Sequence, residues 1–399
     1  MFTYNKRKGL EKILRKIPNS LSSLIIDVLN PIRKKYVKNN IHPKWITLFI
    51  TNYCSARCGH CFYSKELNNK IEELNLENLK KIFLSLQKPL NTLRITGGEP
   101  FLNKSLEEFV IFIDKNKISK KIAITSHGMI PKLNERVSEI LKNINNIHLH
   151  IGISLDGLDK THDSFRKIKN GFNLATKHLL DFKQFSSNYS NFTFSTTTSL
   201  IRKISIKNEN QKSLELMDLL KYLKNVIGVK NVGFDHVRSV ENDVFNVPKE
   251  IMSTFGLPPK KDEHIKTKHT RADEVQLSID EIENVNKELR LSGYLSNDYL
   301  TMRRLEIEHE ILKNKSKVID CLAGYVDCVI YPSLDVSVCE STNSFANLRK
   351  FNFNLIELLN SNLAIERREL TSKCSCTHPC HLSDSMAYDT KFLKEYFKN

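Results

Sequence analysis

The sequence Trp45-Ile-Thr-Leu-Phe-Ile-Thr-Asn52 leads through Tyr53 into Cys54-Ser-Ala-Arg-Cys58-Gly-His-Cys61. The first stretch is rich in β-branched and aromatic residues and predicts a strand, so the cysteines follow its carboxyl end. Three thiolates on one short loop can bind three corners of a four-iron cluster, whereas a ferredoxin-type cluster or a zinc site needs a fourth ligand. The chain offers none nearby, which leaves one iron open to another molecule. Zinc bound by these cysteines and a distant residue is the alternative.

Strands and helices alternate from this point to residue 240. The predicted strands are Trp45–Asn52, Thr92–Thr96, Lys121–Ser126, Ile147–Leu155, Asn191–Ser199 and Asn231–Val237. The helical patterns lie near residues 75–88, 104–117, 132–144, 171–186 and 211–225. Regular alternation of this kind predicts a parallel sheet covered by crossover helices. Six such units are fewer than a closed eight-stranded barrel needs. We therefore expect an α/β fold, a partial (β/α)6 barrel, with its chemistry at the carboxyl ends of the strands.

The second predicted strand ends in Thr96-Gly97-Gly98-Glu99-Pro100. Two glycines allow positive φ angles and let the backbone approach a ligand. The Glu99 carboxylate can accept a hydrogen bond from an ammonium group. A Gly-Gly turn is common by itself, but one strand-to-helix unit after the cysteine loop it indicates a binding site.

The fourth predicted strand ends in Ser154-Leu155-Asp156-Gly157, and Arg166 follows. Serine and aspartate at a strand end can hold a ribose hydroxyl or another polar group. A carboxylate that forms a turn or caps a helix is an equal alternative for Asp156. The third strand ends in Ser126-His127-Gly128. His127 can face a substrate, but we favour a role in ending the strand.

The cysteine loop, the Gly97–Pro100 turn and the Ser154–Gly157 stretch together resemble the radical S-adenosylmethionine (radical SAM) enzymes, over residues 45–240 and onward to 385. The resemblance implies that Cys54, Cys58 and Cys61 hold a 4Fe–4S cluster whose open iron binds S-adenosylmethionine. It implies that Gly97, Gly98, Glu99 and Pro100 bind the methionine amine, that Ser154 and Asp156 lie close to the cosubstrate, and that Arg166 approaches its carboxylate. The His127 position departs from the asparagine usual in relatives. No catalytic residue is assigned.

Six further cysteines lie around a predicted hairpin, Tyr325–Tyr331 and Val336–Val338. This region resembles the SPASM and Twitch extensions of radical SAM enzymes, which carry auxiliary clusters. Two fully ligated clusters need about eight thiolates, so we expect one auxiliary iron–sulfur cluster, of the 4Fe–4S type. The expected ligands are Cys321, Cys339, Cys374 and either Cys376 or Cys380, and Cys328 is expected to be a buried thiol. Zinc in this region is the alternative.

Four zones follow from these patterns: a basic helical extension at 1–44, the radical SAM core at 45–240, a linker and helical region at 241–317, and an auxiliary-cluster domain with a helical tail at 318–399. The net charge is +16, and residues 1–44 carry eleven Lys or Arg but two acids. We interpret this charge as a solvated surface. The apolar stripe within 1–44 is expected to pack on the protein; contact with a membrane surface is an alternative that we do not favour.

Nine cysteines and a charged start without a signal peptide favour the cytoplasm and metal-binding thiolates rather than disulfides. The favoured function is modification of a ribosomally made peptide, with reducing electrons from a flavodoxin or ferredoxin. The alternative is a small-molecule substrate: a sugar, an aminoglycoside or a lipid precursor. A zinc-bearing nucleic-acid-binding protein is a remote third hypothesis, because it leaves the Gly97–Pro100 turn unexplained, and we do not expect nucleic acid as a partner.

Overall fold

The computed structural model describes residues 16–71, 74–206, 214–229, 231–237, 244–252, 277–293 and 299–398. Its strands are β1 (Trp45–Phe49), β2 (Thr92–Thr96), β3 (Lys121–Ser126), β4 (His148–Ser154), β5 (Phe192–Leu200), β6 (Val232–His236), β7 (Val244–Phe245), β8 (Asp327–Ile330), β9 (Asp335–Ser337), β10 (Ala346–Asn347) and β11 (Ser375–Cys376). The α-helices of the first half are α2 (Asn19–Asn39), α3 (Leu76–Leu84), α4 (Leu106–Lys115), α5 (Leu133–Asn143), α6 (Asp159–Arg166), α7 (Gly171–Asn188), α8 (Arg202–Ser205) and α9 (Glu215–Tyr222). Those of the second half are α12 (Ile279–Leu291), α13 (Tyr299–Asn314), α14 (Leu355–Leu359), α15 (Asn362–Thr371), α16 (Pro379–Met386) and α17 (Thr390–Lys398).

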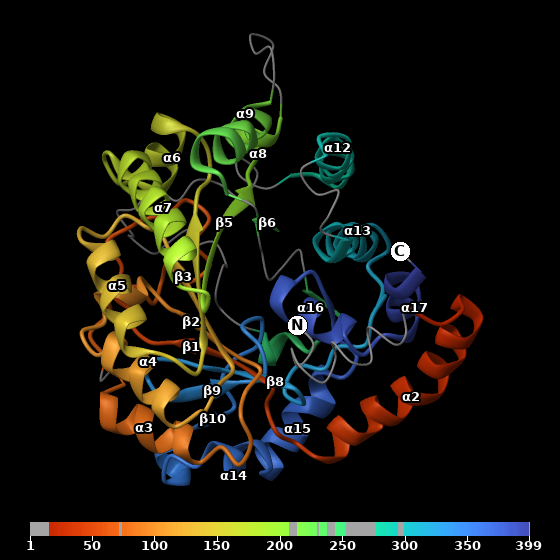
Figure 1. Ribbon diagram of the computed structural model, residues 1–399. Helices are drawn as coiled ribbons and strands as arrows, with labels where there is room; N and C mark the ends of the chain where they lie inside the picture. Colours follow the sequence, from red (N-terminus) through yellow and green to blue (C-terminus); the bar gives the residue numbers. More distant parts are fainter. Residues whose placement is uncertain are drawn as a thin grey trace.

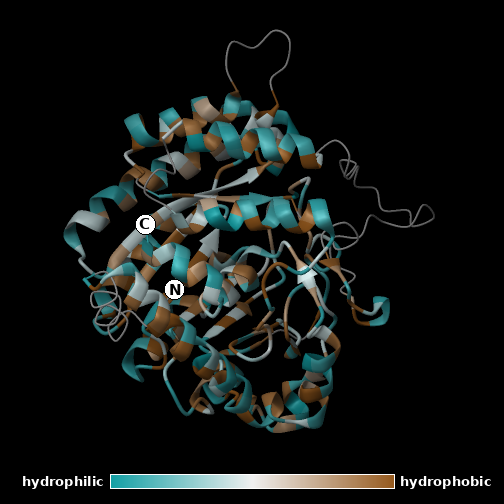
Figure 2. Cartoon of the chain, turned by 90° about the vertical axis from the view of Figure 1, so that its right-hand side faces the viewer, coloured by the Kyte–Doolittle hydropathy of each residue, from teal (hydrophilic) through white to brown (hydrophobic). Residues whose placement is uncertain are grey.

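Strands β1 to β6 are parallel neighbours in chain order, which confirms the predicted α/β fold with an open, partial barrel. Helices α3, α4, α5 and α7 lie along one side of these strands (Figure 1). Figure 2 shows that hydrophobic and hydrophilic residues alternate along the helices. In α4, for example, Phe109, Val110 and Ile113 are fully buried. Every residue of β1 is buried, whereas β2 to β4 bury alternate residues and carry Arg94, Lys121, His148 and His150 on the other face of the sheet.

The predicted C-terminal hairpin is present as β8 and β9, but it also extends the main sheet. Strand β8 pairs in parallel with β1, with Trp45 opposite Asp327 and Ile46 opposite Cys328. The nine-stranded order is therefore β10-β9-β8-β1-β2-β3-β4-β5-β6. Cys328 lies in the core of the sheet with no exposed surface. This pairing places β8, which contains Cys328 and follows Cys321, beside β1, the strand that leads into the first cysteine loop.

The N-terminal helix α2 packs against α17 (Figure 1). Asn30 fixes this contact because its buried side-chain amide donates to the Tyr388 carbonyl at 2.7 Å. The opposite face leaves Leu24, Val28 and Ile32 more than half exposed. The expectation that the apolar stripe packs on the protein is therefore wrong for Leu21, Leu24, Val28 and Leu29, which are exposed, because the face that packs carries Ile26 and Asn30 instead. The earlier part of that stripe, up to residue 15, lies outside the described residues.

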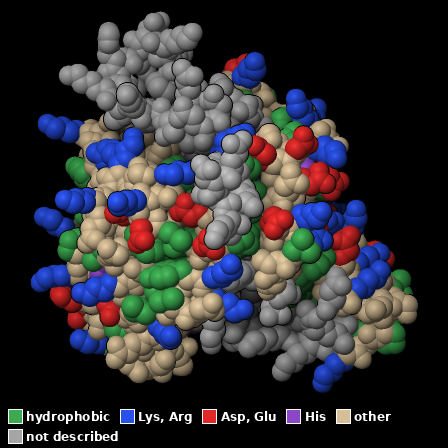
Figure 3. Space-filling model, turned by 90° about the horizontal axis from the view of Figure 1, so that it is seen from above, with side chains coloured by type: hydrophobic (Ala, Val, Ile, Leu, Met, Phe, Trp, Pro, Cys, Tyr) green, Lys and Arg blue, Asp and Glu red, His purple; other side chains and the backbone are tan. Residues whose placement is uncertain are grey.

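The region 241–317 contributes α12 and α13, which pack on each other. The helix predicted near 278–291 is confirmed, and it begins at a capping box in which Ser278 and Glu281 bond each other's backbone. A short strand that the sequence did not predict, β7, pairs with β11 beside Cys376. Within the described ranges, no helix is both long and apolar enough to cross a membrane. On the face seen in Figure 3, Lys and Arg side chains are spread among acidic and apolar ones.

Candidate active site

The first cysteine loop leaves the end of β1 and is fixed by backbone contacts on two sides. The Cys54 amide donates to Asn68 Oδ1 at 3.1 Å, and the Asn68 amide donates to the Asn52 carbonyl at 3.0 Å. On the other side, the Gly59 amide donates to the carbonyl of Phe165 at 3.1 Å, near the end of α6. The loop is therefore held between its own return segment and the helix that follows β4.

The three thiols of this loop lie near one another, and each of these cysteines is partly buried. The pKa of Cys54 is raised to about 11 and that of Cys61 to about 12. Burial is the largest cause in both, and the charge of Cys58 contributes in the same direction. Burial also raises the pKa of Cys58, and the Arg166 guanidinium beside it acts in the opposite direction. The metal-free thiols are therefore protonated at neutral pH, so that binding of iron must release protons.

Single-ion and cluster sites make different demands on this arrangement. Among the residues that the structure describes, no three histidine, cysteine, aspartate or glutamate side chains converge closely enough to hold one metal ion. A four-iron cluster does not require such convergence, because each thiolate binds its own iron at a separate corner. Three partly buried, neighbouring thiols on one loop suit that second demand.

The Gly97–Pro100 turn lies directly against the start of the cysteine loop. The Gly98 amide donates to the Thr51 carbonyl at 2.8 Å, and the Glu99 amide donates to the Tyr53 carbonyl at 2.7 Å. A Cβ atom at Gly98 would lie 2.1 Å from the Tyr53 carbonyl oxygen, and Gly97 has a φ of +138°. Both glycines are therefore required by the close approach of two backbone segments, whereas the sequence suggested an approach to a ligand.

Glu99 is fully buried, and β3 supplies two of its partners. Its Oε1 accepts from Ser126 Oγ at 2.8 Å and from the Phe101 amide at 3.2 Å. Its Oε2 accepts from the His127 amide at 2.9 Å. The carboxylate thus ties the Gly97–Pro100 turn to the end of β3.

His127 connects the same strand end to the cysteine loop, a role that the sequence analysis missed. Its Nδ1 accepts from the Met129 amide at 2.9 Å, and its Nε2 lies 3.1 Å from Ser55 Oγ. Burial lowers the pKa of His127, so the ring is neutral with the proton on Nε2, which then donates to Ser55. The signal in the sequence was that His127 stands where relatives have asparagine. An imidazole is longer than an asparagine side chain and can therefore reach the cysteine loop.

Asp156 and Arg166 are paired with each other at the end of β4. Arg166 Nε donates to Asp156 Oδ2 at 2.8 Å, and Asp156 Oδ1 accepts from the Ser199 amide at 2.7 Å. Burial alone would raise the pKa of Asp156, but the Arg166 charge and smaller contributions, which include the hydrogen bond from the Ser199 amide, together outweigh it, so the net shift is downward. Arg166 thus stands between this carboxylate and the Cys58 thiol. Ser154 is the last residue of β4, half-buried and opposite Thr197 of β5.

Two histidines support this corner. His60, inside the cysteine loop, stacks on Phe165 with ring centroids 4.8 Å apart, and its Nε2 lies 3.1 Å from Ser199 Oγ. His162 Nδ1 accepts from the Asp156 amide at 3.1 Å. Burial and the nearby Arg166 charge lower the pKa of His162 to about 4. His162 therefore acts here as a neutral hydrogen-bonding group, and both side chains hold the loop and the strand end.

Four of the C-terminal cysteines, from three separate stretches of the sequence, lie near one another in the structure. Burial raises the pKa of Cys321, and the neighbouring Cys376 and Cys339 thiols raise it further. Cys374 makes a hydrogen bond with Cys376, and the charges of Cys321 and Cys339 also raise its pKa. Cys380, at the start of α16, lies instead near Arg94 and Arg304, and its charge contributes to raising the pKa of both. Between the two alternatives for a fourth thiol, the structure thus groups Cys376, not Cys380, with the others.

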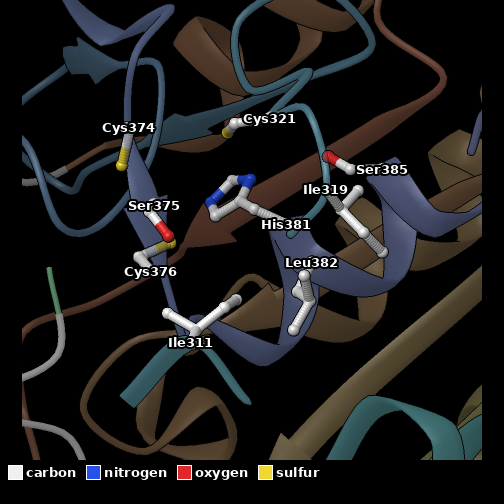
Figure 4. A pocket seen from close by; sticks show the side chains of 9 residues that line it. All are labelled: Ile311, Ile319, Cys321, Cys374, Ser375, Cys376, His381, Leu382 and Ser385. Carbon is white, nitrogen blue, oxygen red and sulfur yellow. The ribbon is translucent and has the colours of Figure 1, made fainter. Parts of the chain in front are cut away.

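A pocket beside these thiols is lined by Cys321, Cys374, Cys376 and His381, among other residues (Figure 4). His381 projects from α16 into the space between the three cysteines. Its Nδ1 lies 2.6 Å from Asp327 Oδ2. Burial lowers the pKa of His381, but the Asp327 carboxylate outweighs burial and the net shift is upward. The sequence analysis did not single out this histidine, because nothing local connects it to Asp327, 54 residues earlier.

Comparison with known proteins adds an independent result for the core. Residues 48–234 match the model of the radical SAM superfamily. The GTP 3',8-cyclase of Campylobacter jejuni is 30% identical over 142 residues, which cover 34% of this chain and 40% of that protein. The subtilosin biosynthesis protein AlbA of Bacillus subtilis is 30% identical over 132 residues, which cover 33% of this chain and 28% of that protein. The chain thus matches less than half the length of these curated relatives.

Solved structures share the fold over most of the chain. SuiB of Streptococcus suis, bound to the precursor peptide SuiA, has a TM-score of 0.56 at 14% identity, covering 87% of this chain and 73% of that one. The anSMEcpe protein with bound AdoMet and a peptide has a TM-score of 0.53 at 15% identity, covering 90% and 98%. At such identities the likeness concerns the fold alone. Residues 48–234, which contain the Cys54–Cys61 loop, the Gly97–Pro100 turn and the Asp156–Arg166 pair, match the radical SAM superfamily.

Proposed function

We propose that this chain is a radical SAM enzyme that modifies a ribosomally synthesised peptide. The observation that carries the proposal is the set of three partly buried, neighbouring thiols of Cys54, Cys58 and Cys61, packed against the Gly97–Pro100 turn. In this proposal the thiolates hold a 4Fe–4S cluster, and S-adenosylmethionine binds its open iron. When bound and reduced, these groups supply a 5′-deoxyadenosyl radical that removes a hydrogen atom from the substrate.

The chain's own part is to bind and orient these groups. The loop keeps the thiolates partly buried, and Arg166 offsets their negative charge on the Cys58 side. Gly97, Gly98, Glu99 and Pro100 are proposed to receive the methionine amine of the cosubstrate. Glu99 is aligned for this by Ser126 and His127.

Ser154, Asp156 and Arg166 are proposed to border the rest of the cosubstrate. Because Asp156 and Arg166 already neutralise each other, we propose that the pair acts as one rigid dipolar wall of the site. A cosubstrate carboxylate would then approach the guanidinium face that Asp156 does not cover.

We propose that the C-terminal cysteines hold one auxiliary iron–sulfur cluster. The supporting observation is the mutual proximity of Cys321, Cys339, Cys374 and Cys376. Cys380 is then a spare thiol, and a flavodoxin or ferredoxin is the proposed source of electrons. The parallel pairing of β8 with β1 joins their segments in one sheet, with Cys321 before the start of β8 and Cys54 after the end of β1.

The peptide substrate is supported by the fold and by one relative. SuiB and anSMEcpe are solved with bound peptides, and AlbA is named for the biosynthesis of a bacteriocin. A small-molecule substrate is the second candidate, and the similarity to GTP 3',8-cyclases favours it.

The two candidates separate in one experiment. The protein is reconstituted anaerobically, reduced with dithionite, and given S-adenosylmethionine with either candidate precursor peptides or a set of small molecules that includes GTP. We expect a mass change of the peptide together with 5′-deoxyadenosine formed in proportion. A product formed from GTP or another small molecule, with the peptides unchanged, would contradict the peptide assignment and leave the radical chemistry in place.

A further inference from the structure

His381 is oriented as metal-binding histidines are oriented in proteins. Its side chain is 2% exposed, and its Nδ1 bonds the buried Asp327 carboxylate at 2.6 Å. The other ring nitrogen, Nε2, is buried and has no hydrogen-bond partner among the residues that the structure describes. A buried polar atom without a partner is energetically unfavourable, so such an atom calls for an explanation. A carboxylate on one ring nitrogen and a metal on the other is a common arrangement that satisfies both.

The helix that carries His381 is fixed from two further points. Arg94 of β2 binds Asp384 with two hydrogen bonds, of 2.8 and 2.6 Å. The Leu322 amide donates to Ser385 Oγ at 3.0 Å. The imidazole is thus held rigidly by α16 and β8 at once, as a metal ligand requires.

The ring is surrounded by sulfur donors. Cys321, Cys374 and Cys376 line the same pocket, and Figure 4 shows the imidazole between them. The pocket lining does not include Cys339, whose thiol donates instead to Thr342 Oγ1 at 3.7 Å. The donors that face this pocket are therefore three thiols and one imidazole.

We propose that His381 Nε2 is a direct ligand of the auxiliary centre, alongside Cys321, Cys374 and Cys376. The inference rests on the auxiliary cluster proposed above and replaces one of its thiolates by nitrogen. Iron–sulfur centres accept imidazole in place of thiolate, and the exchange raises their reduction potential.

The test uses the full chain with Cys54, Cys58 and Cys61 replaced by alanine, so that only the C-terminal centre can bind iron. After anaerobic reconstitution with iron and sulfide and reduction with dithionite, pulsed EPR records nitrogen hyperfine coupling. We expect a strong coupling that changes when histidine is labelled with 15N. The same coupling is expected to be absent in His381→Cys, which keeps a donor atom and its iron.

His378→Gln is the matched control. Its ring lies 4.5 Å from that of His381, and its Nε2 bonds Glu340 at 2.7 Å. This variant is expected to keep the coupling. A cluster signal without coupling to a bound nitrogen, or with coupling unchanged in His381→Cys, would overturn the ligand assignment alone. Absence of any cluster in the C-terminal region would overturn the auxiliary centre, and with it this ligand.

Discussion

The guanidinium of Arg166 donates from Nε to Asp156 Oδ2 at 2.8 Å, and both side chains are buried beside Cys58. Removing one partner of a buried ion pair leaves an uncompensated charge, at a cost of about 3 to 5 kcal/mol. We expect Arg166→Gln to lower the free energy of unfolding by about that amount, measured by urea denaturation of the metal-free protein. Adding Asp156→Asn should restore part of the loss. Strictly additive effects of the two substitutions would show that the pair is not coupled.

The contact between the Gly97–Pro100 turn and the cysteine loop leaves no room for a side chain at Gly98. Gly98→Ala places its Cβ 2.1 Å from the Tyr53 carbonyl oxygen, which must move the turn away from the loop. We expect binding of S-adenosylmethionine to weaken at least about tenfold, by equilibrium dialysis of the reconstituted protein. Gly152→Ala is the control, because the nearest atom to its Cβ lies at 3.7 Å. Equal affinities of the two variants would contradict this account of the turn.

His162 makes the stability of the core depend on pH. Its pKa is lowered to about 4 in the folded protein, from an ordinary value of 6.5. The unfolded chain therefore takes up a proton first, and stability falls as the pH drops from about 6.5 to about 4, by up to about 3 kcal/mol. His162→Asn keeps an acceptor for the Asp156 amide but does not titrate. Urea denaturation at pH 7.5 and at pH 5 should show a smaller difference for this variant; an unchanged difference would assign the effect to other groups.

Asp327 should control metal binding through His381. The Gly324 amide donates a hydrogen bond to Asp327 Oδ1 at 3.1 Å, and Asp327→Asn keeps an oxygen for this bond. The substitution removes the negative charge that faces His381 Nδ1. Replacing such a supporting carboxylate typically weakens metal binding about 10- to 100-fold. We expect iron to leave the C-terminal centre faster in a chelator challenge, while the centre on Cys54, Cys58 and Cys61 keeps its iron. Equal rates of loss in variant and parent would remove Asp327 from this role.

The sequence was sufficient to predict the strands of the core because their signals are local. Strands β2 and β3 have the predicted bounds, since each is a short apolar run between turns. Helix α6 was not predicted: it has eight residues, and only His162 and Arg166 are buried. A helix without an apolar stripe gives no periodic signal.

The features that sequence reasoning missed are pairings between distant segments. Nothing near residue 327 indicates that β8 lies parallel to β1, about 280 residues earlier. The sequence left open whether Cys376 or Cys380 joins the other C-terminal thiols, because this depends in the same way on how distant segments are arranged in space. The thiol spacing suits either residue, and the contact of Arg94 with Asp384 fixes which side of α16 faces the pocket. Ser55, the partner of His127, and Asp327, the partner of His381, likewise lie far from these histidines in the sequence.

The central claim is that Cys54, Cys58 and Cys61 support reductive cleavage of S-adenosylmethionine. Its most direct test is the amount of 5′-deoxyadenosine formed under dithionite by the reconstituted wild type, by Cys58→Ala and by Cys328→Ala, whose thiol is buried in β8. We predict product from the wild type and from Cys328→Ala, and none above background from Cys58→Ala. Undiminished product from Cys58→Ala would contradict the account.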